Sequence, residues 1–346
     1  MRILVMGGTW FLGKAVVEGA LLRGWEVTTF NRGRSGVDVP GVKAVRGDRT
    51  DSDDLDSLAA HGPWDAVVDT SASEMAPRDV LLGTQLLADR ASRYVYVSTV
   101  SVYAGWPDER LTAESLVLDG PADADEDYGR MPAGAPGPNL HYGRQKAGAE
   151  RAVLAAFGAD RSAILRPGVI LGPGEYVGRL PYWLHRAALG GPILAPGNPG
   201  QTIQPVDVRD VAEFLLEEAA SSGPAVHNLA APIGRDTMGS FLASCLDVTG
   251  GRGELVWAPD DFLVGQGVRQ WTELPLWRTH AGVWQVDASS ALGAGFRSRP
   301  LEETVRDTWA WLSADGRPVP HPRAADHGLD PDKEQRLLAA IGGLIR

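Results

Sequence analysis

The sequence has a single cysteine, an excess of acidic over basic residues and no long apolar run. Cys245 alone cannot form an internal disulfide, and its apolar helical surroundings favour a buried, unreactive thiol. No segment reaches the ~18 apolar residues of a membrane span, and the N-terminus enters a strand pattern without the apolar region of a signal peptide. The sequence therefore predicts a cytoplasmic protein without disulfides and without membrane contact.

The formal charge of −11 argues against general nucleic-acid binding, because neutralising phosphates requires a basic face. The seven histidines have none of the spacings typical of catalytic metal sites, so we expect no metal. The expected partner is a small-molecule substrate, bound by a monomer or a homodimer. At 346 residues, the chain has room for one large α/β domain and a smaller lobe.

A strand, a glycine turn and a helix open the chain. The apolar run Arg2–Met6 ends at the turn Gly7-Gly8-Thr9-Trp10-Phe11-Leu12-Gly13, and a helical pattern continues to Arg23 before a second strand begins at Glu26. In this setting, backbone N–H groups and a helix N-terminus can hold a pyrophosphate. The alternation of strands and helices continues to residue 172, which predicts an α/β fold with a Rossmann-type doubly wound parallel sheet.

Tyr142 and Lys146 are the candidate reactive pair. On a helix, side chains four residues apart share a face at about 5–6 Å. A phenol titrates near ~10, so acid–base work near neutral pH requires a pKa shift of about three units, or about 4 kcal/mol. At an effective dielectric near ~20, the attraction between a phenolate and an ammonium about 4 Å away is of the same size. The spacing is therefore sufficient for acid–base chemistry, although such a pair also occurs on ordinary surface helices.

Upstream motifs give this pair its weight. Ser98 and Thr99 end a predicted strand, Val102-Tyr103 follow, and the YxxxK pair comes about 40 residues later. Together with the glycine turn, these motifs resemble the extended short-chain dehydrogenase/reductase family, in its atypical branch described as isoflavone-reductase-like or epimerase/dehydratase-like. The resemblance covers about residues 1–312, most firmly 1–172. It implies a catalytic triad of Thr99, Tyr142 and Lys146.

The same resemblance assigns the cofactor site. The family pattern GxxGxxG has Trp10 in place of its middle glycine, and the family's adenine-binding aspartate corresponds to Asp48. Residues 31–34 read Asn-Arg-Gly-Arg, with no carboxylate to repel a 2′-phosphate, so NADP(H) is favoured over NAD(H). The candidate cofactor-binding residues are Gly7, Thr9, Trp10, Phe11, Leu12, Gly13, Asn31, Arg32, Arg34, Asp48, Arg49, Thr70, Ser71, Ala72, Lys146 and Pro167.

A substrate lobe is expected after the dinucleotide-binding domain. We predict the Rossmann domain over residues 1–172 with 203–230 returning to it, the lobe over 173–202 and 231–314, and a C-terminal linker and helix over 315–346. Core packing is a competing interpretation for the aromatic residues of the lobe, and structural salt bridges are one for its arginines. The candidate substrate-binding residues are Ser98, Ser101, His141, Arg179, Trp183 and Arg209.

These features predict an NADP(H)-dependent reductase or dehydrogenase that acts on a carbonyl or alcohol of a small or secondary metabolite. An NAD(P)-dependent epimerase of a sugar or nucleotide sugar is the first alternative, although Ile203 stands where related epimerases carry a diphosphate-binding arginine. A 4,6-dehydratase is disfavoured, because Val100 and Ser101 replace its acidic residues. A relative that binds nucleotides or RNA without catalysis is the alternative from another class.

Overall fold

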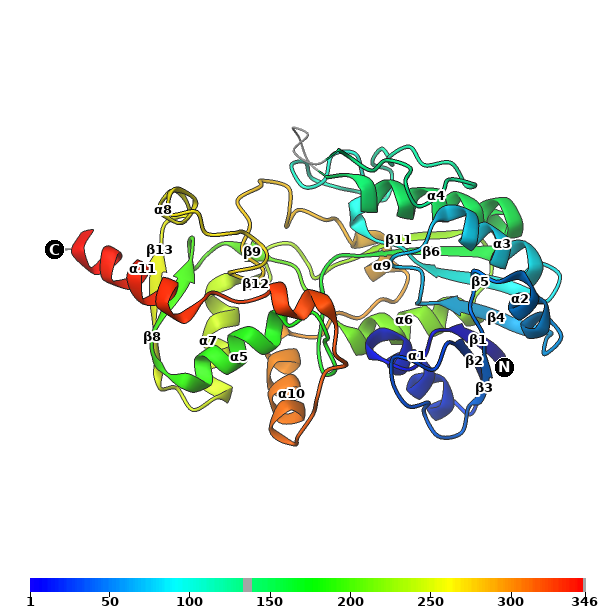
Figure 1. Ribbon diagram of the computed structural model, residues 1–346, viewed down its shortest axis with the longest axis horizontal. Helices are drawn as coiled ribbons and strands as arrows, with labels where there is room; N and C mark the ends of the chain where they lie inside the picture. The colour runs from blue at the N-terminus through cyan, green and yellow to red at the C-terminus, as the bar shows by residue number, and fades with distance from the viewer. Residues whose placement is uncertain (133–138, 345–346) are drawn as a thin grey trace. The chain divides into compact units, whose positions relative to one another are not determined.

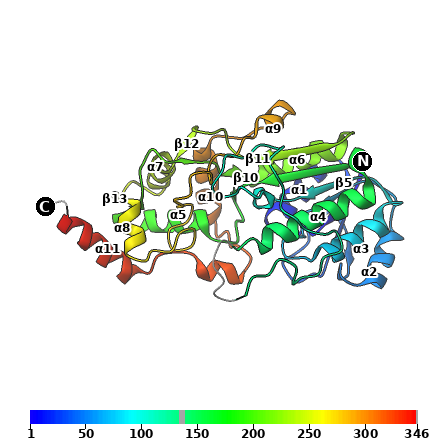
Figure 2. The same cartoon turned by 90° about the horizontal axis from the view of Figure 1, so that it is seen from above.

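The computed structural model describes residues 1–132 and 139–344, and the chain divides into two compact units. Unit 1 comprises Met1–Gly168, Val208–Ala230 and Val286–Arg297. Unit 2 comprises Val169–Asp207, Ala231–Gln285 and Ser298–Arg346. Both units are drawn in Figure 1 and, from a second direction, in Figure 2.

Unit 1 is built on a seven-stranded sheet in which every neighbouring pair runs parallel. Its order is β11-β6-β5-β4-β1-β2-β3, so the direction of winding reverses between β1 and β4, where a doubly wound sheet binds its ligand. The strands are β1 (Arg2–Met6), β2 (Glu26–Asn31), β3 (Lys43–Arg46), β4 (Trp64–Asp69), β5 (Ala91–Val97), β6 (Ser162–Pro167) and β11 (Ala225–Leu229).

Helices cover both faces of this sheet. In Figure 1, α2, α3 and α4 lie over one face, and α1 and α6 pack together over the other. Central β1 is therefore buried on both sides, and Ile3, Leu4 and Val5 are fully buried, as the continuous apolar runs of parallel strands require. The helices are α1 (Phe11–Leu22), α2 (Ser52–Ala59), α3 (Pro77–Leu87), α4 (His141–Phe157), α6 (Val208–Ala220) and α9 (Ser289–Gly293). The predicted Rossmann-type fold is confirmed.

Unit 2 consists of helices and three two-stranded sheets, which pair β10 with β7, β12 with β9 and β13 with β8. Its strands are β7 (Ile170–Leu171), β8 (Gly191–Pro196), β9 (Thr202–Ile203), β10 (Val206–Asp207), β12 (Asp236–Thr237) and β13 (Gly253–Ala258). Its helices are α5 (Arg179–Leu189), α7 (Met238–Val248), α8 (Asp260–Gly265), α10 (Leu301–Ser313) and α11 (Pro331–Leu344). None of the helices in the described part of the chain has the length and hydropathy needed to cross a membrane.

The segment Val286–Arg297 belongs to unit 1, although the sequence predicts it within the substrate lobe. Side-chain contacts hold it there: Asn228 on β11 donates to the Asp287 carbonyl at 3.2 Å, and the His227 ring lies 3.0 Å from the Ser290 hydroxyl. Helix α5 and strand β8 were also not predicted. Both lie in unit 2, where no regular βα alternation guides an assignment.

Candidate functional site

The glycine turn between β1 and α1 leaves no room for side chains at its ends. Gly7 and Gly8 have φ of 105° and 101°, values that L side chains rarely adopt. A Cβ on Gly13 would come within 2.8 Å of both the Gly8 nitrogen and the Thr70 hydroxyl oxygen. Trp10 is extended and immediately precedes α1. The turn is thus a tight backbone cradle at a helix N-terminus, which fits the phosphates of a dinucleotide.

The segment Thr70-Ser71-Ala72 follows β4 and connects three parts of the site. The Thr70 hydroxyl donates to the Met6 carbonyl at the end of β1 over 3.0 Å. The Ser71 hydroxyl accepts from Arg49 at 2.7 Å, and the Ala72 carbonyl accepts from Lys146 at 3.3 Å. This predicted cofactor segment therefore links the glycine turn to the candidate catalytic lysine.

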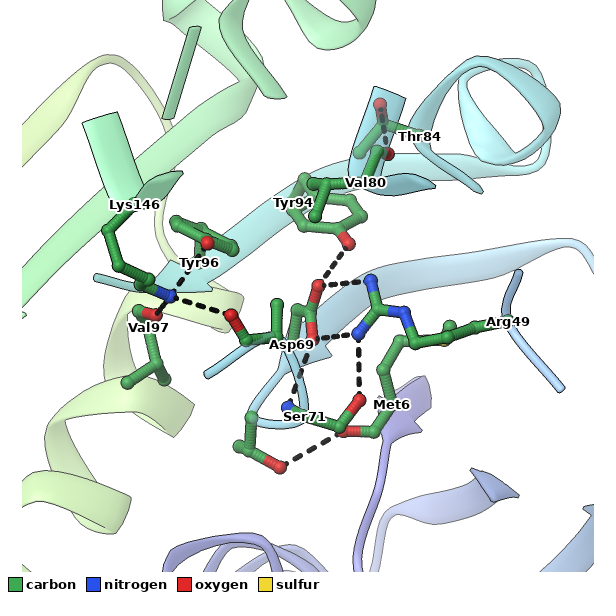
Figure 3. Close-up of polar contacts among 12 residues, drawn as sticks. Met6, Arg49, Asp69, Ser71, Val80, Thr84, Tyr94, Tyr96, Val97 and Lys146 are labelled. Carbon is green, nitrogen blue, oxygen red and sulfur yellow. Dashed lines mark hydrogen bonds and ion pairs between the residues drawn. The ribbon is translucent and has the colours of Figure 1, made fainter. Parts of the chain in front are cut away.

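A buried ion pair lies beneath that segment (Figure 3). Arg49 donates two hydrogen bonds to Asp69, at 2.7 and 2.8 Å, and the Tyr94 hydroxyl donates to the same carboxylate at 2.8 Å. Burial disfavours the charge of Asp69, but Arg49 outweighs it and holds the pKa of Asp69 below its usual value. Arg49, a predicted cofactor residue, thus directs its guanidinium to Asp69 and Ser71.

The loop after β2 carries the residues predicted to recognise a 2′-phosphate. Asn31 donates to the Gly7 carbonyl at 3.2 Å and accepts from Arg46 at 2.7 Å, which ties this loop to the glycine turn. Arg32 lies 3.7 Å from Asp48, and both side chains are largely exposed. A hydrogen bond from the Thr50 backbone lowers the pKa of Asp48, and the charges of Arg32 and Arg34 lower it further. Two guanidiniums therefore lie near the predicted adenine-binding aspartate.

Helix α4 brings Tyr142 to the end of β5. A Cβ on Gly143 would collide with the Ser101 carbonyl, so the first turn of α4 lies directly against the short helix η1 (Val100–Val102). Thr99 caps this short helix: its hydroxyl accepts from the Ser101 N–H at 3.2 Å and donates to the Ser101 hydroxyl at 3.3 Å. The Tyr142 side chain is 43% exposed. The structure thereby brings the candidate tyrosine next to the Thr99–Ser101 segment.

Lys146 lies one turn further along α4 and is 3% exposed. Its ammonium donates to the carbonyls of Val97 and Ala72 at 2.6 and 3.3 Å and lies 2.6 Å from the Tyr96 hydroxyl (Figure 3). Burial lowers the pKa of Lys146 to about 7, against the opposing effect of the Asp69 charge. Near neutral pH, the charged and neutral forms of this lysine are consequently close in free energy.

Ser98 is committed to a buried network behind the site. Its hydroxyl donates to Glu150, which lies one turn after Lys146 and accepts two hydrogen bonds from Arg166 at 2.9 and 2.6 Å. Arg166 also donates to the Tyr103 hydroxyl at 2.9 Å. The network connects β5, β6 and α4, so it fixes the strand end that presents Thr99.

The remaining candidate residues have varied surroundings. The His141 ring lies 3.1 Å from the Tyr128 carbonyl, and Pro167 is the last residue of β6. Arg209 is the second residue of α6. Trp183, at 1% exposed, donates to the Pro275 carbonyl at 2.9 Å, which is the placement of a core residue in unit 2.

Unit 2 contains two arginines against one indole, a group we call the arginine–tryptophan cluster. The Arg278 and Arg179 guanidiniums lie 4.3 and 5.3 Å from the centroid of the Trp271 ring. Burial lowers the pKa of Arg278 to about 10, and repulsion from Arg179 contributes. Trp271 has a φ of 71°, which a bulky residue rarely adopts. Hydrogen bonds between Gln270 and Thr279, both 2.9 Å, close the loop that carries Trp271 and Arg278.

The sequence analysis missed several of these residues. Tyr96 and Asp69 are strand residues whose partners lie far away in the sequence, and Glu150 reads as an ordinary helix residue. Only the GDR sequence at 47–49 and the strand end at Asp69 could have suggested a buried pair. Nothing in the sequence signals that Trp271 and Arg278 come together.

A family model confirms the predicted class. The model of the NAD dependent epimerase/dehydratase family matches residues 3–229, and the chain belongs to this family. It is therefore an enzyme of the extended short-chain dehydrogenase/reductase type. In the described part of the chain, no group of three or more His, Cys, Asp or Glu side chains could hold a metal ion.

Relatives within this class include reductases. The chain is 34% identical over 242 residues to the 2-alkyl-3-oxoalkanoate reductase of Stenotrophomonas maltophilia, covering 65% of this chain and 68% of the relative. It is 31% identical over 243 residues to the 2′-dehydrokanamycin reductase of Streptomyces kanamyceticus, covering 65% and 63%. The Bordetella bronchiseptica enzyme WbmH in complex with NAD+ has a similar fold, with a TM-score of 0.65, 18% identity and coverage of 91% and 99%.

Proposed function

We propose that the protein is an NADP(H)-dependent reductase that converts a carbonyl of a small oxo acid into an alcohol. The observation that carries the proposal is the placement of Lys146, one helical turn after Tyr142 on α4. Its ammonium donates to the carbonyl of Val97, the last residue of β5, and Thr99 follows two residues later. Both homologous enzymes described above are named as reductases. Substrate and direction of reaction are therefore inferred from the site together with these names.

Three side chains perform the proton chemistry. The hydroxyls of Thr99 and Tyr142 hydrogen-bond the carbonyl oxygen, and Tyr142 donates its proton as that oxygen gains negative charge. The Lys146 ammonium, one turn further along α4, stabilises the resulting tyrosinate by its charge. Bound NADPH supplies the hydride that reduces the carbonyl carbon.

The residues of the glycine turn and of the loop after β2 fit this cofactor. The backbone cradle of Gly7, Gly8 and Gly13 can approach a pyrophosphate without a side chain intervening. Arg32 and Arg34 offer guanidiniums to a 2′-phosphate, and Asp48 is available for the adenine. The two arginines favour NADP(H), since a carboxylate at the end of β2 would be needed to select NAD(H).

The names of the two reductases give substrates of opposite charge. An oxoalkanoate is an anion, whereas kanamycin derivatives carry amino groups. We choose the oxo acid because the chain is 34% identical to the first relative and 31% identical to the second. Unit 2 by itself offers a candidate anion-binding group in the arginine–tryptophan cluster, where two guanidiniums on one indole attract a carboxylate.

An epimerase that keeps its reduced cofactor is the second candidate, because the family model describes epimerases. Ile203 counts against a nucleotide-sugar substrate: it is fully buried on β9, where related epimerases are expected to place an arginine. Cofactor exchange separates the two reactions. A reductase consumes free NADPH in proportion to product, while an epimerase purifies with tightly held dinucleotide and consumes none.

Substitution of Tyr142 by phenylalanine tests the proposal directly. With NADPH and a 2-alkyl-3-oxoalkanoate, the wild-type protein should oxidise NADPH, and Tyr142→Phe should lower kcat about 10²–10⁴-fold because it removes the proton donor. Tyr128→Phe is a matched control, since the exposed Tyr128 hydroxyl donates to Asp119 rather than entering the proposed reaction. Equal turnover in wild type and Tyr142→Phe would exclude this mechanism.

A further inference from the structure

Tyr96 contributes more to the lysine site than a hydrogen bond. Besides the 2.6 Å contact between its hydroxyl and the Lys146 nitrogen, the Tyr96 ring centroid lies 4.1 Å from that nitrogen. The hydroxyl and the carbonyls of Val97 and Ala72 give the nitrogen three oxygen neighbours. We call these three oxygens and the Tyr96 ring the ammonium cage (Figure 3).

The cage matches the charged form of Lys146. An ammonium has three N–H donors and no acceptor, so three oxygens satisfy it completely. A neutral amine has two N–H donors, which the two carbonyls would use, and one lone pair, which could accept only an uncharged and weaker hydrogen bond from the Tyr96 hydroxyl.

We propose that Tyr96 is a positioning residue that keeps Lys146 charged inside the protein and thereby sets the pH range in which Tyr142 can act. The inference rests on the proposed function of Tyr142 and Lys146, but it concerns a residue to which that function assigns no role. Tyr96 itself is buried and touches neither substrate nor cofactor in the proposed reaction.

The other charged groups around Lys146 do not replace the cage. Asp69 on β4 and Glu150 on α4 favour the ammonium, whereas Arg49 opposes it. Asp69 is engaged by Arg49 and Tyr94, and Glu150 by Arg166 and Ser98, so each carboxylate is largely compensated. Tyr142 lies one turn earlier on α4, and its tyrosinate form is the group that the ammonium stabilises in the proposed reaction.

The balance is delicate, because burial brings the pKa of Lys146 to about 7. A hydrogen bond to the charged ammonium is about 1 kcal/mol stronger than one to the neutral amine, and this difference corresponds to a pKa shift of about one unit. Losing the Tyr96 hydroxyl would therefore reduce the charged fraction of Lys146 at pH 7 from about one half to about one tenth.

Titration of the lysine side chains tests the proposal. The chain has four lysines, Lys14, Lys43, Lys146 and Lys333, so ¹³C-labelled lysine gives few NMR signals, and Lys146→Met identifies the one in question. In Tyr96→Phe, which keeps the ring, we expect the pKa of Lys146 to fall by about one unit. The basic limb of the kcat profile should move to lower pH by the same amount.

Tyr94→Phe is the matched control. Tyr94 is also a buried tyrosine of β5, but its hydroxyl donates to Asp69 and not to Lys146. A pKa of Lys146 that is unchanged or raised in Tyr96→Phe would overturn the proposal, since the hydroxyl would then be indifferent to the ammonium or a donor to the neutral amine.

Two further measurements keep the outcome unambiguous. The dispersed signals of the other lysines and the thermal transition show whether Tyr96→Phe is folded. Should it fail to fold, the wild-type titration decides: an amine already neutral at pH 6 would contradict the cage. Absence of NADPH-dependent reduction would instead refute the proposed function. The titration of Lys146 does not depend on turnover, so it would still test the role of Tyr96.

Discussion

Buried arginines are treated differently in the two units. Beneath the glycine turn, Arg49 is held by two hydrogen bonds from its guanidinium to Asp69, and Arg166 makes the same double contact with Glu150. In the arginine–tryptophan cluster, Arg179 and Arg278 share one indole and repel each other. The Arg49 and Arg166 guanidiniums are each held against one carboxylate, whereas Arg179 and Arg278 also face each other, with Glu175 3.8 Å from Arg179. The two buried pairs of unit 1 therefore hold segments together, whereas the cluster of unit 2 concentrates positive charge.

Removing the carboxylate of the buried pair should have the largest effect. Asp69→Asn leaves Arg49 charged and without its ionic partner, so the free energy of unfolding should fall by about 3–5 kcal/mol. Urea unfolding followed by circular dichroism measures the change. Asp48→Asn is the control: its ion pair with Arg32 spans 3.7 Å at the surface, and its loss should change stability by less than about 1 kcal/mol. Equal losses in both variants would contradict the assigned structural role of the Arg49–Asp69 pair.

Neutralising one arginine of unit 2 should act on binding instead. Arg278→Gln should weaken the binding of a carboxylate by the cluster about 10–100-fold, because a charge-assisted hydrogen bond contributes about 1.5–3 kcal/mol. Stability should fall less than in Asp69→Asn, because Arg179 opposes the charge of Arg278. Calorimetric titration with a carboxylate and urea unfolding measure the two effects.

Arg269→Gln makes the same change on an exposed arginine of unit 2, which lies 3.8 Å from Glu273. It should leave the affinity for the carboxylate near the wild-type value. If Arg278→Gln destabilised the protein as strongly as Asp69→Asn, the distinction between the two regions would fail.

The pH dependence of the free energy of unfolding extends the comparison to Lys146, a buried residue of unit 1. Among the described residues, its nitrogen contacts uncharged oxygens and no carboxylate. Its pKa is about 7 in the folded protein against 10.5 for the unperturbed group, so between these values the unfolded chain binds more protons. The free energy of unfolding should therefore rise with pH from about 7 to about 10.5, by at most ~1.4 kcal/mol per unit. Lys146→Met should lack this component, and identical slopes in both proteins would contradict the lowered pKa.

The smallest effect is expected at the exposed arginines of unit 1. Arg32→Gln should reduce the preference for NADPH over NADH about tenfold, the equivalent of one charge-assisted contact to the 2′-phosphate. The ratio of kcat/KM for the two cofactors measures it. Arg2→Gln, at the opposite end of the central strand, should leave the ratio unchanged. A ratio unaffected by both substitutions would remove Arg32 from cofactor selection.

The fold of unit 1 could be predicted because each βα unit has a recognisable pattern within a short stretch of sequence. The run Arg2–Met6 is apolar throughout, the turn after it is rich in glycine, and the pattern then repeats. Unit 2 gives no such pattern: β7, β9, β10 and β12 have two residues each, too few to show a period. Their pairing depends on contacts between distant segments.

The candidate site was predictable only where a motif is local. Tyr142 and Lys146 share a helix, so their spacing alone indicates a common face. Arg49 illustrates the limit: its position suggests a cofactor contact, but its guanidinium is bound by Asp69, 20 residues away. Tyr96 reads as one more apolar strand residue, because the alternation of a buried strand does not distinguish a packing tyrosine from one that contacts an ammonium.

Gly143 has a consequence for how the proposed site can vary. Since α4 lies directly against the Ser101 carbonyl at this residue, the separation of the helix from η1 is set by main-chain atoms. Even a methyl group there would act as a wedge and lift the tyrosine before it away from Thr99. A residue without a side chain thus sets the position of the proposed proton donor.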